Sequence, residues 1–419
     1  MSASPIWHPF TQHGLEPAAT PIARAEGAWL EARDGAKIFD AISSWWVVTH
    51  GHRHPKIVAA IQKQAAELNQ IVFAGFTHAP AEAVAKTLID MAPSGLSHVF
   101  FSDSGSTSVE VALKMALGFF ANRGDARTRI LGLEHAYHGD TVGAMSAGGR
   151  GVFNASYAPL LFDVMRIPFP APGHRQTTLD ALDAACLAGD VAAFIAEPLI
   201  LGAGGMLIYD AETLAAMRAI CARHDVLFIA DEVMTGFGRT GALFACQHAG
   251  ITPDILCLAK GLTGGALPLA ATLCRPDIFE AHRSQNRAQM FFHSSSYSAN
   301  PIACAAAAAN LEIWRTEPVG ERIAVLEELQ QAQMARVASD CRFANVRRLG
   351  TIVAFDVLHA EGGYLADVAL ALRHAALARG LLIRPLGATV YVMPPYCATQ
   401  KDLAFAYDAL SSACDEAIA

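Results

Sequence analysis

Two short apolar runs, at residues 226–230 and 255–259, are the most informative part of the hydrophobic pattern. Continuous apolar runs of this length predict buried strands of an α/β sheet. Asp231 directly follows the first run, and Lys260 directly follows the second. Because open α/β sheets bind ligands at the carboxyl ends of their strands, we expect both side chains at a ligand site. The glycine-rich residues 236–241, GFGRTG, predict a surface excursion between the two strands.

A third segment predicts a strand, a turn and a helix in succession. Residues 97–102, SHVFFS, predict a short strand, and a turn of serine and glycine leads into a helix that begins near Gly105 and Ser106. The unpaired N–H groups and the positive dipole end at such a helix start favour a phosphate. The same pattern is also typical of an ordinary serine-capped helix, so the motif alone does not decide between the two.

Both ends of the chain differ from the middle in their hydrophobic pattern. A hairpin is predicted with its turn at Asp34 and Gly35, and an amphipathic helix at residues 319–338 precedes a strand at 351–357. This mixture predicts a small α+β domain beside a large α/β domain with a mostly parallel sheet. We predict the N-terminal part of the small domain at 1–50, the large domain at 51–316 and the C-terminal part of the small domain at 317–419.

Composition limits the possible classes of protein. Hydrophobic residues make up 53% of the chain and charged residues 17%, which would fit a tightly paired oligomer. A membrane span is not expected, because charged residues such as Lys114 and Glu312 interrupt every run of about 20 apolar residues. The N-terminus lacks the basic start and apolar core of a secretory signal. A net charge of −8 argues against a nucleic-acid surface.

Cysteine and histidine positions were considered as possible disulfide or metal sites. The 9 cysteines show no C-x-x-C spacing and have an odd total, so we predict reduced thiols in a cytoplasmic protein. His50, His52 and His54 alternate, as metal ligands on a strand would. No acidic or cysteine ligand accompanies them, and Gly51 and Pro55 mark a turn, so we predict no metal site.

Asp231 and Lys260 carry the candidate chemistry. Taken alone, an aspartate after a strand is often a helix cap, and a lysine there is usually solvated. Together they supply what pyridoxal 5'-phosphate chemistry requires, namely a carboxylate for the pyridinium nitrogen and an amine for a Schiff base. The carboxylate would keep the ring electron-poor, and the released lysine would move a proton as a general base.

A resemblance to a known family extends over nearly the whole chain. ADEVMTGFGRTG at 230–241 and PDILCLAKGLTGG at 253–265 resemble motifs of the class III pyridoxal-phosphate aminotransferases. IWHPFTQ, SSWW, AYHGDT and IRPLG are most similar to the group within this class that transfers an amino group from S-adenosylmethionine to 8-amino-7-oxononanoate in biotin synthesis. The resemblance implies fold type I and a pyridoxal 5'-phosphate cofactor.

The resemblance also implies roles for single residues around the cofactor. Lys260, Asp231 and Tyr137 correspond to catalytic positions, and Tyr137 would stack on the pyridine ring and touch substrate. Gly105 and Ser106 would bind the phosphate. These five residues are therefore our expected cofactor contacts within one chain.

Substrate and subunit contacts are implied as well. Phe10 and Trp45 would wall the substrate pocket beside Tyr137 and Lys260, and Arg384 would hold the carboxylate of the oxononanoate. Relatives often carry tyrosine at the position of Phe10, so a hydroxyl is missing here. The loop with Ser294, Ser295 and Ser296 would reach the neighbouring subunit, where Ser295 and Ser296 bind the cofactor phosphate and Ser294 contacts substrate. A homodimer with shared active sites is therefore expected.

Several other functions share parts of this pattern. The nearest alternative is a class III transaminase that uses lysine or an ω-amino acid as donor. Relatives acting on ω-amino acids often carry a glutamate where this chain has Ala203, which favours the S-adenosylmethionine reaction. An aminomutase or decarboxylase, and a non-catalytic protein that only binds the cofactor, are further alternatives. The joint presence of Asp231 and Lys260 argues against the last of these.

Overall fold

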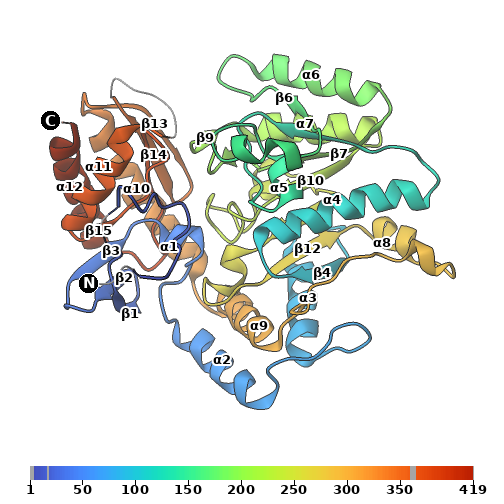
Figure 1. The fold of residues 1–419 in the computed structure, drawn as a ribbon, viewed down its shortest axis with the longest axis horizontal. Coiled ribbons are helices and arrows are strands. Elements are labelled where there is room, and N and C mark those ends of the chain that lie inside the picture. The colour runs from blue at the N-terminus through green and yellow to red at the C-terminus, as the bar shows by residue number, and fades with distance from the viewer. Residues whose placement is uncertain (1–3, 17, 359–364, 419) are drawn as a thin grey trace.

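The computed structural model describes residues 4–16, 18–358 and 365–418, and its larger part is built on a seven-stranded sheet (Figure 1). Strand β12 runs antiparallel to both of its neighbours, and the other pairings are parallel. The predicted α/β fold with a mostly parallel sheet is thereby confirmed. Across the sheet the strands are β4 (His98–Ser102), β12 (Ala270–Cys274), β11 (Ile255–Leu258), β10 (Leu227–Asp231), β7 (Val191–Ala196), β5 (Arg129–Leu133) and β6 (Met165–Ile167).

Helices cover both faces of this sheet, because both faces of its strands are apolar. One core cluster joins the sheet to α4, α5 and α8, and another joins the opposite face to α3, α6, α7 and α9. Strands β10 and β11, predicted from the two apolar runs, lie side by side with Ile229 opposite Ile255. The helices are α3 (Ala79–Met91), α4 (Gly105–Asn122), α5 (Val142–Ala147), α6 (Arg175–Leu187), α7 (Ala211–Arg223), α8 (Pro276–His282) and α9 (Pro301–Thr316).

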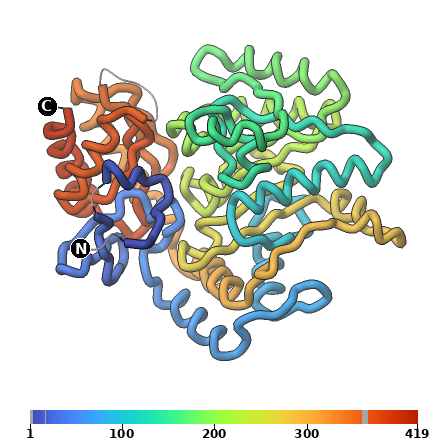
Figure 2. The backbone as a smooth tube through the Cα atoms, in the orientation of Figure 1, coloured from blue at the N-terminus to red at the C-terminus, as the bar shows by residue number. Residues whose placement is uncertain are grey.

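Both ends of the chain meet in a second, smaller part, drawn in blue and in orange to red (Figure 2). Strand β15 pairs with β3 and so completes the N-terminal sheet, whose β2–β3 hairpin turns at Asp34 and Gly35 as predicted. A separate antiparallel sheet contains β13, which we did not predict. The elements are β1 (Ile22–Glu26), β2 (Trp29–Ala32), β3 (Lys37–Asp40), α10 (Val319–Ala338), β13 (Phe343–Leu349), β14 (Ile352–Val357), α11 (Asp367–Ala378), β15 (Leu381–Leu382), β16 (Thr389–Val392) and α12 (Gln400–Ile418). The domain boundaries after residues 50 and 316 stay a prediction.

Short elements connect these parts. Between residues 54 and 92 the chain forms two helices, α2 and α3, with non-helical residues between them. A two-stranded ribbon and four 3₁₀ turns lie in the loops of the large part. The remaining elements are α1 (Ser43–Trp46), α2 (Pro55–Glu67), η1 (Ala155–Leu160), β8 (Ile200–Leu201), β9 (Leu207–Ile208), η2 (Ala245–Ala249), η3 (Lys260–Thr263) and η4 (Arg287–Gln289).

The GFGRTG segment is buried, so the prediction of a surface excursion was wrong. Phe237 and Arg239 are each 1% exposed. The Arg239 guanidinium donates to the backbone carbonyls of Trp46 at 3.1 Å and Val48 at 2.8 Å, and it lies over the ring of Tyr396. Carbonyls distant in sequence therefore satisfy its donors, which allows a charged side chain to be buried. Burial lowers the pKa of Arg239 from its usual value.

Three further expectations concern membranes, thiols and metals. No helix in the described residues is long and apolar enough to cross a membrane. All 9 cysteines are free, and the cytoplasmic location stays a prediction. No group of three potential metal-binding side chains occurs within the described ranges. His52 instead lies 2.9 Å from Asp40, and His54 lies 3.6 Å from Glu317.

Candidate active site

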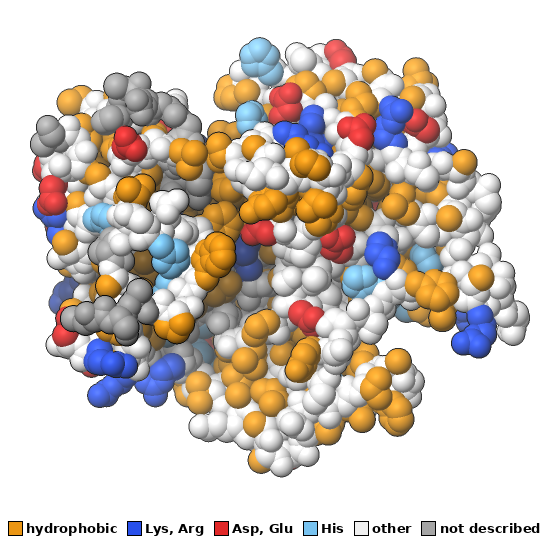
Figure 3. Space-filling model, in the orientation of Figure 1, with side chains coloured by type: hydrophobic (Ala, Val, Ile, Leu, Met, Phe, Trp, Pro, Cys, Tyr) orange, Lys and Arg blue, Asp and Glu red, His pale blue; other side chains and the backbone are white. Residues whose placement is uncertain are grey.

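A cavity of about 430 Å³ opens at the carboxyl ends of the central strands, where the molecule is hollowed between its two parts (Figure 3). Asp231 ends β10, Lys260 follows β11, and Glu197 follows β7; all three line the cavity. The start of α4 lines it too, and Trp46 comes from the smaller part. Asp231 and Lys260, which we expected at one ligand site, both line this cavity.

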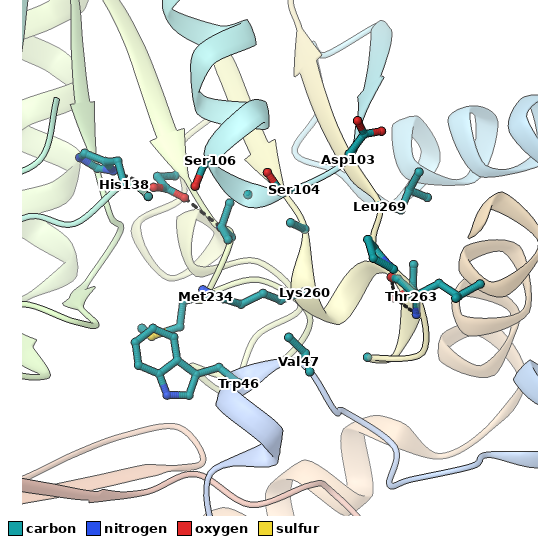
Figure 4. Close-up of a pocket in the computed structure, with 18 of the residues that line it drawn as sticks. Trp46, Val47, Asp103, Ser104, Ser106, His138, Met234, Lys260, Thr263 and Leu269 are labelled. Carbon is teal, nitrogen blue, oxygen red and sulfur yellow. Dashed lines mark hydrogen bonds and ion pairs between the residues drawn. The ribbon is translucent and has the colours of Figure 1, made fainter. Parts of the chain in front are cut away.

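Lys260 extends its side chain into the cavity from a strained turn (Figure 4). Its backbone has φ of 44°, in the left-handed region that non-glycine residues rarely adopt. Its Nζ atom lies 4.7 Å from the centre of the Trp46 ring. Burial lowers the pKa of the amine to about 8, although the nearby Asp231 opposes this shift. The side chain is therefore poised to lose and regain a proton near neutral pH.

Asp231 is held by a partner that we did not predict. Its Oδ2 atom lies 2.7 Å from Nδ1 of His138, and its Oδ1 accepts a hydrogen bond from the backbone N–H of Val233. His138 follows β5 and Asp231 ends β10, and both strands are neighbours of β7 in the sheet. The contact between the two side chains could therefore have been predicted from the strand order.

Glu197 is a second buried carboxyl group at this edge of the sheet. It accepts backbone hydrogen bonds from Tyr137 and Gly202, each at 2.9 Å. Burial raises its pKa to about 7, and the positive potential of His138 works against that rise. Its observed contacts show that it holds the backbone of the Tyr137 loop.

The start of helix α4 lines the same cavity as Lys260 and Trp46 (Figure 4). Ser104 caps the helix by accepting from Thr107 N–H, and Gly105 and Ser106 are the first helical residues. A Cβ on Gly105 would lie 2.6 Å from Val233, so only glycine fits without displacement of that side chain. The free N–H groups of the first turn remain available for an anion.

These residues fit the expected cofactor. Pyridoxal 5'-phosphate needs a phosphate site, a carboxylate for its ring nitrogen and a lysine for its aldehyde. One cavity contains a close-packed helix start at Gly105, a buried carboxylate at Asp231 and the amine of the half-buried Lys260. Within the described residues, that amine has no hydrogen bond or ion pair to occupy it.

The two tryptophans of the SSWW motif point to different places. Trp46 lines the Lys260 cavity and donates from Nε1 to the hydroxyl of Tyr391 at 3.0 Å. Trp45, which we expected in the substrate pocket, packs 4.5 Å from the Arg384 guanidinium and 5.5 Å from the Phe10 ring. The contact of Trp46 with Lys260 was therefore not predicted.

Phe10 and Arg384 belong to an aromatic cluster that leads to Tyr137. Arg384 donates to the backbone carbonyl of Phe10 at 2.6 Å, and the rings of Phe10 and Tyr137 each lie 6.1 Å from that of Phe153. A second cavity, of about 550 Å³, is lined by Tyr137, Phe153 and Ala203. It shares Tyr137 with the first cavity, so the two spaces meet at this ring.

The serine cluster lies outside the Lys260 cavity of its own chain. Ser294 and Ser296 are exposed, and Ser295 is half-buried with its hydroxyl hydrogen-bonded to Asp103. The carbonyl of Ser296 accepts from the Gln70 side chain at 2.6 Å. The roles expected for these serines, like those of Phe10, Trp45 and Arg384, stay predictions.

Comparison with known proteins agrees with this geometry. The family model described as aminotransferase class-III matches residues 10–414. An adenosylmethionine-8-amino-7-oxononanoate aminotransferase of Synechococcus elongatus is 46% identical, with 98% of both chains covered. A protein of the same name from Geobacter sulfurreducens is 36% identical over 97% of this chain and 94% of its own.

Solved structures agree as well. The aminotransferase of the same name from Methanocaldococcus jannaschii has a TM-score of 0.94 at 34% identity and covers 98% of this chain and 97% of its own. An amine transaminase from an uncultivated Pseudomonas species, in a PLP-bound form, has a TM-score of 0.90 at 33% identity over 98% of both chains. This protein belongs to the class III aminotransferases, which use pyridoxal 5'-phosphate, and it has their fold type I architecture.

Proposed function

We propose that this protein transfers the amino group of S-adenosylmethionine to the ketone of 8-amino-7-oxononanoate, forming 7,8-diaminononanoate in biotin synthesis. The location of Asp231 and Lys260 at the ends of adjacent parallel strands in one cavity carries the transaminase part of the proposal. The full-length relatives named for this activity support the choice of substrates.

Pyridoxal 5'-phosphate supplies, when bound, an electron-poor ring that accepts the electron pair left by a broken Cα–H bond. We infer that Asp231 would hold the ring nitrogen in its protonated form. His138 would fix the direction of that carboxylate through its 2.7 Å contact. Gly105 and Ser106 would bind the phosphate, and Tyr137 would cover one face of the ring.

Lys260 would both hold the cofactor aldehyde and move the proton. A pKa near 8 leaves a substantial neutral fraction of the amine in mildly alkaline solution, so it can accept a proton from the donor Cα. The same ammonium group can return a proton to the carbon that becomes C7 of the product. One residue therefore serves both halves of a ping-pong reaction.

Substrate contacts are proposed for the aromatic cluster. Arg384 would bind the carboxylate of the oxononanoate with two parallel hydrogen bonds, which its guanidinium geometry allows. Trp45 packs against the Arg384 guanidinium, and the Phe10 ring packs against Trp45. The two rings would enclose the apolar chain of that substrate. Phe10 offers no hydroxyl, so this wall would act by packing alone.

We infer a homodimer in which each active site uses the serine loop of the partner. Ser294 and Ser296 are exposed, although the family motif gives them site roles. Large apolar side chains near this loop are exposed too, with Phe292 at 60%, Tyr297 at 63% and Phe76 at 60%. Hydrophobic side chains also gather near α2 and α9 in the lower part of Figure 3. A second copy of the chain would bury such a surface.

The amino donor can be tested by single half-reactions. The fold alone does not identify the donor. Structures of ω-transaminases match this chain with TM-scores close to that of the Methanocaldococcus jannaschii aminotransferase. Purified yellow enzyme is mixed separately with S-adenosylmethionine, lysine, alanine and an ω-amino acid, and the visible absorbance of the cofactor is followed. We expect bleaching by S-adenosylmethionine. Bleaching by lysine or the ω-amino acid instead would replace the donor and leave the transaminase assignment intact.

A further inference from the structure

The SSWW segment adopts a turn of unusual hand. Ser43, Ser44, Trp45 and Trp46 have φ values of 52°, 46°, 67° and 74°, so successive non-glycine residues all occupy the left-handed region. Each such residue is disfavoured by contact between its Cβ and the backbone. A run of them persists only where surrounding groups hold it in place.

The carboxylate of Asp40 lies inside this turn and is 0% exposed. Its Oδ1 accepts from the N–H of Ser44 at 2.8 Å and from that of Ile42 at 3.4 Å. Its Oδ2 accepts from the Ser44 hydroxyl at 2.8 Å and lies 2.9 Å from Nε2 of His52. One buried charge thus binds the backbone and the side chain of the strained segment.

The turn sends two neighbouring indole rings to two separate regions. Trp46 lies over the Lys260 amine in the cofactor cavity, and Trp45 lies over the Arg384 guanidinium in the aromatic cluster. Both tryptophans depend on the same backbone conformation, so a change in the turn would displace both indole rings together. Asp40 itself touches neither Lys260 nor Arg384 in any hydrogen bond of the described residues.

We propose that Asp40 is a positioning residue for substrate binding, because it holds the left-handed Ser43–Trp46 turn that places Trp46 at Lys260 and Trp45 at Arg384. This inference rests on the proposed function for the identity of the two substrates. It does not depend on them for the placement of Trp46, which the bound cofactor can report directly.

The first test compares Asp40→Ala and Asp40→Asn with wild-type holoenzyme. Loss of the turn raises the KM for both S-adenosylmethionine and the oxononanoate by about tenfold to a hundredfold, with a smaller loss of kcat. Asp40→Asn keeps the side-chain volume and one acceptor, so its effect is smaller, and it carries the test if Asp40→Ala does not fold. KM values within twofold of wild type in folded, cofactor-loaded variants would overturn the proposal.

A rescue separates the conformational role from general destabilisation. Glycine adopts φ of +46° without a Cβ penalty, so Ser44→Gly added to Asp40→Ala lowers the raised KM values, whereas Ser44→Ala does not. Equal effects of glycine and alanine would contradict the role in backbone conformation. Asp254→Asn serves as a matched control, because Asp254 is 1% exposed and bonds to Arg218 and to Phe228 N–H instead. It lowers stability without changing either KM.

Tryptophan emission tests the same placement without any substrate. Bound cofactor is expected to quench the emission of Trp46, which lines the Lys260 cavity. This quenching should be smaller in Trp46→Phe and, by displacement of the ring, in Asp40→Ala. Unchanged quenching in Asp40→Ala at full cofactor occupancy would overturn the proposal even if the substrates are as proposed. If wild type fails to react with S-adenosylmethionine while Asp40→Ala loses quenching, the proposed donor fails and the role of Asp40 stands.

Discussion

Nδ1 of His138 lies 2.7 Å from Oδ2 of Asp231, and both side chains are buried at the edge of the Lys260 cavity. We propose that Asp231 can hold a cofactor ring nitrogen only if its carboxylate keeps this direction. His138→Ala removes the contact and is expected to lower kcat by about tenfold to a hundredfold, the effect of losing a hydrogen bond to a charged group. His138→Asn keeps a donor near Nδ1 and should retain more activity. Equal losses in both variants, measured by kcat and cofactor affinity, would contradict this role.

Lys260→Ala is expected to abolish multiple turnover and to leave the fold intact. The variant lacks both the amine for the cofactor and the proton carrier, and general-base loss alone costs about 10² to 10⁴ in rate. Lys260→Arg is the matched control, because arginine keeps a positive charge but does not release its proton near neutral pH. Circular dichroism checks the fold of each variant. Residual multiple turnover by Lys260→Ala would remove Lys260 from its role.

Glu197 should make stability depend on pH in a defined window. Its pKa is raised from 4.5 to about 7 in the folded state, so the folded protein binds more protons between these values. The stabilising contribution is therefore present below pH 4.5 and lost as the pH rises through 7.

The corresponding variant is Glu197→Gln, which cannot titrate. From pH 5 to pH 8, the free energy of unfolding of wild type should fall relative to this variant by on the order of 2 kcal/mol. Urea unfolding at each pH gives the difference. The exposed Glu134 provides a control, and Glu134→Gln should follow wild type. A constant difference between wild type and Glu197→Gln would refute the raised pKa.

Arg384→Ala should weaken binding of one substrate more than the other. A charge-assisted hydrogen bond to a carboxylate is worth about 1.5 to 3 kcal/mol, so the KM for the oxononanoate should rise by about tenfold to a hundredfold. Arg384→Lys keeps the charge but cannot form two parallel hydrogen bonds, so its KM for the oxononanoate should lie between those of wild type and Arg384→Ala. Steady-state kinetics with each substrate varied in turn gives both KM values. An unchanged apparent affinity for the oxononanoate would exclude Arg384 as its carboxylate site.

Local patterns in the sequence were enough to predict the strands that carry Asp231 and Lys260. Both follow uninterrupted apolar runs, and a run buried on both faces needs no distant information to be recognised. The helix that begins at Gly105 was predicted for the same reason, since its cap and small residues are contiguous. These elements contribute much of the lining of the cavity.

Features that depend on distant partners were missed. Arg239 is buried because carbonyls of Trp46 and Val48 accept its hydrogen bonds, and neither lies near it in the sequence. The left-handed turn at Ser43–Trp46 contains no glycine, so no local residue type indicates it. The contact of His138 with Asp231 likewise requires the order of strands in the sheet. Such contacts become visible only once the chain is folded.

The central claim is that nitrogen passes from S-adenosylmethionine to the ketone carbon of 8-amino-7-oxononanoate. The most direct measurement uses S-adenosylmethionine labelled with ¹⁵N at its amino group and follows the product by mass spectrometry with fragment assignment. We predict one ¹⁵N in each 7,8-diaminononanoate, located at C7, and none at C8. Unlabelled product, or label that enters only from ¹⁵N-lysine or a labelled ω-amino acid, would contradict the account.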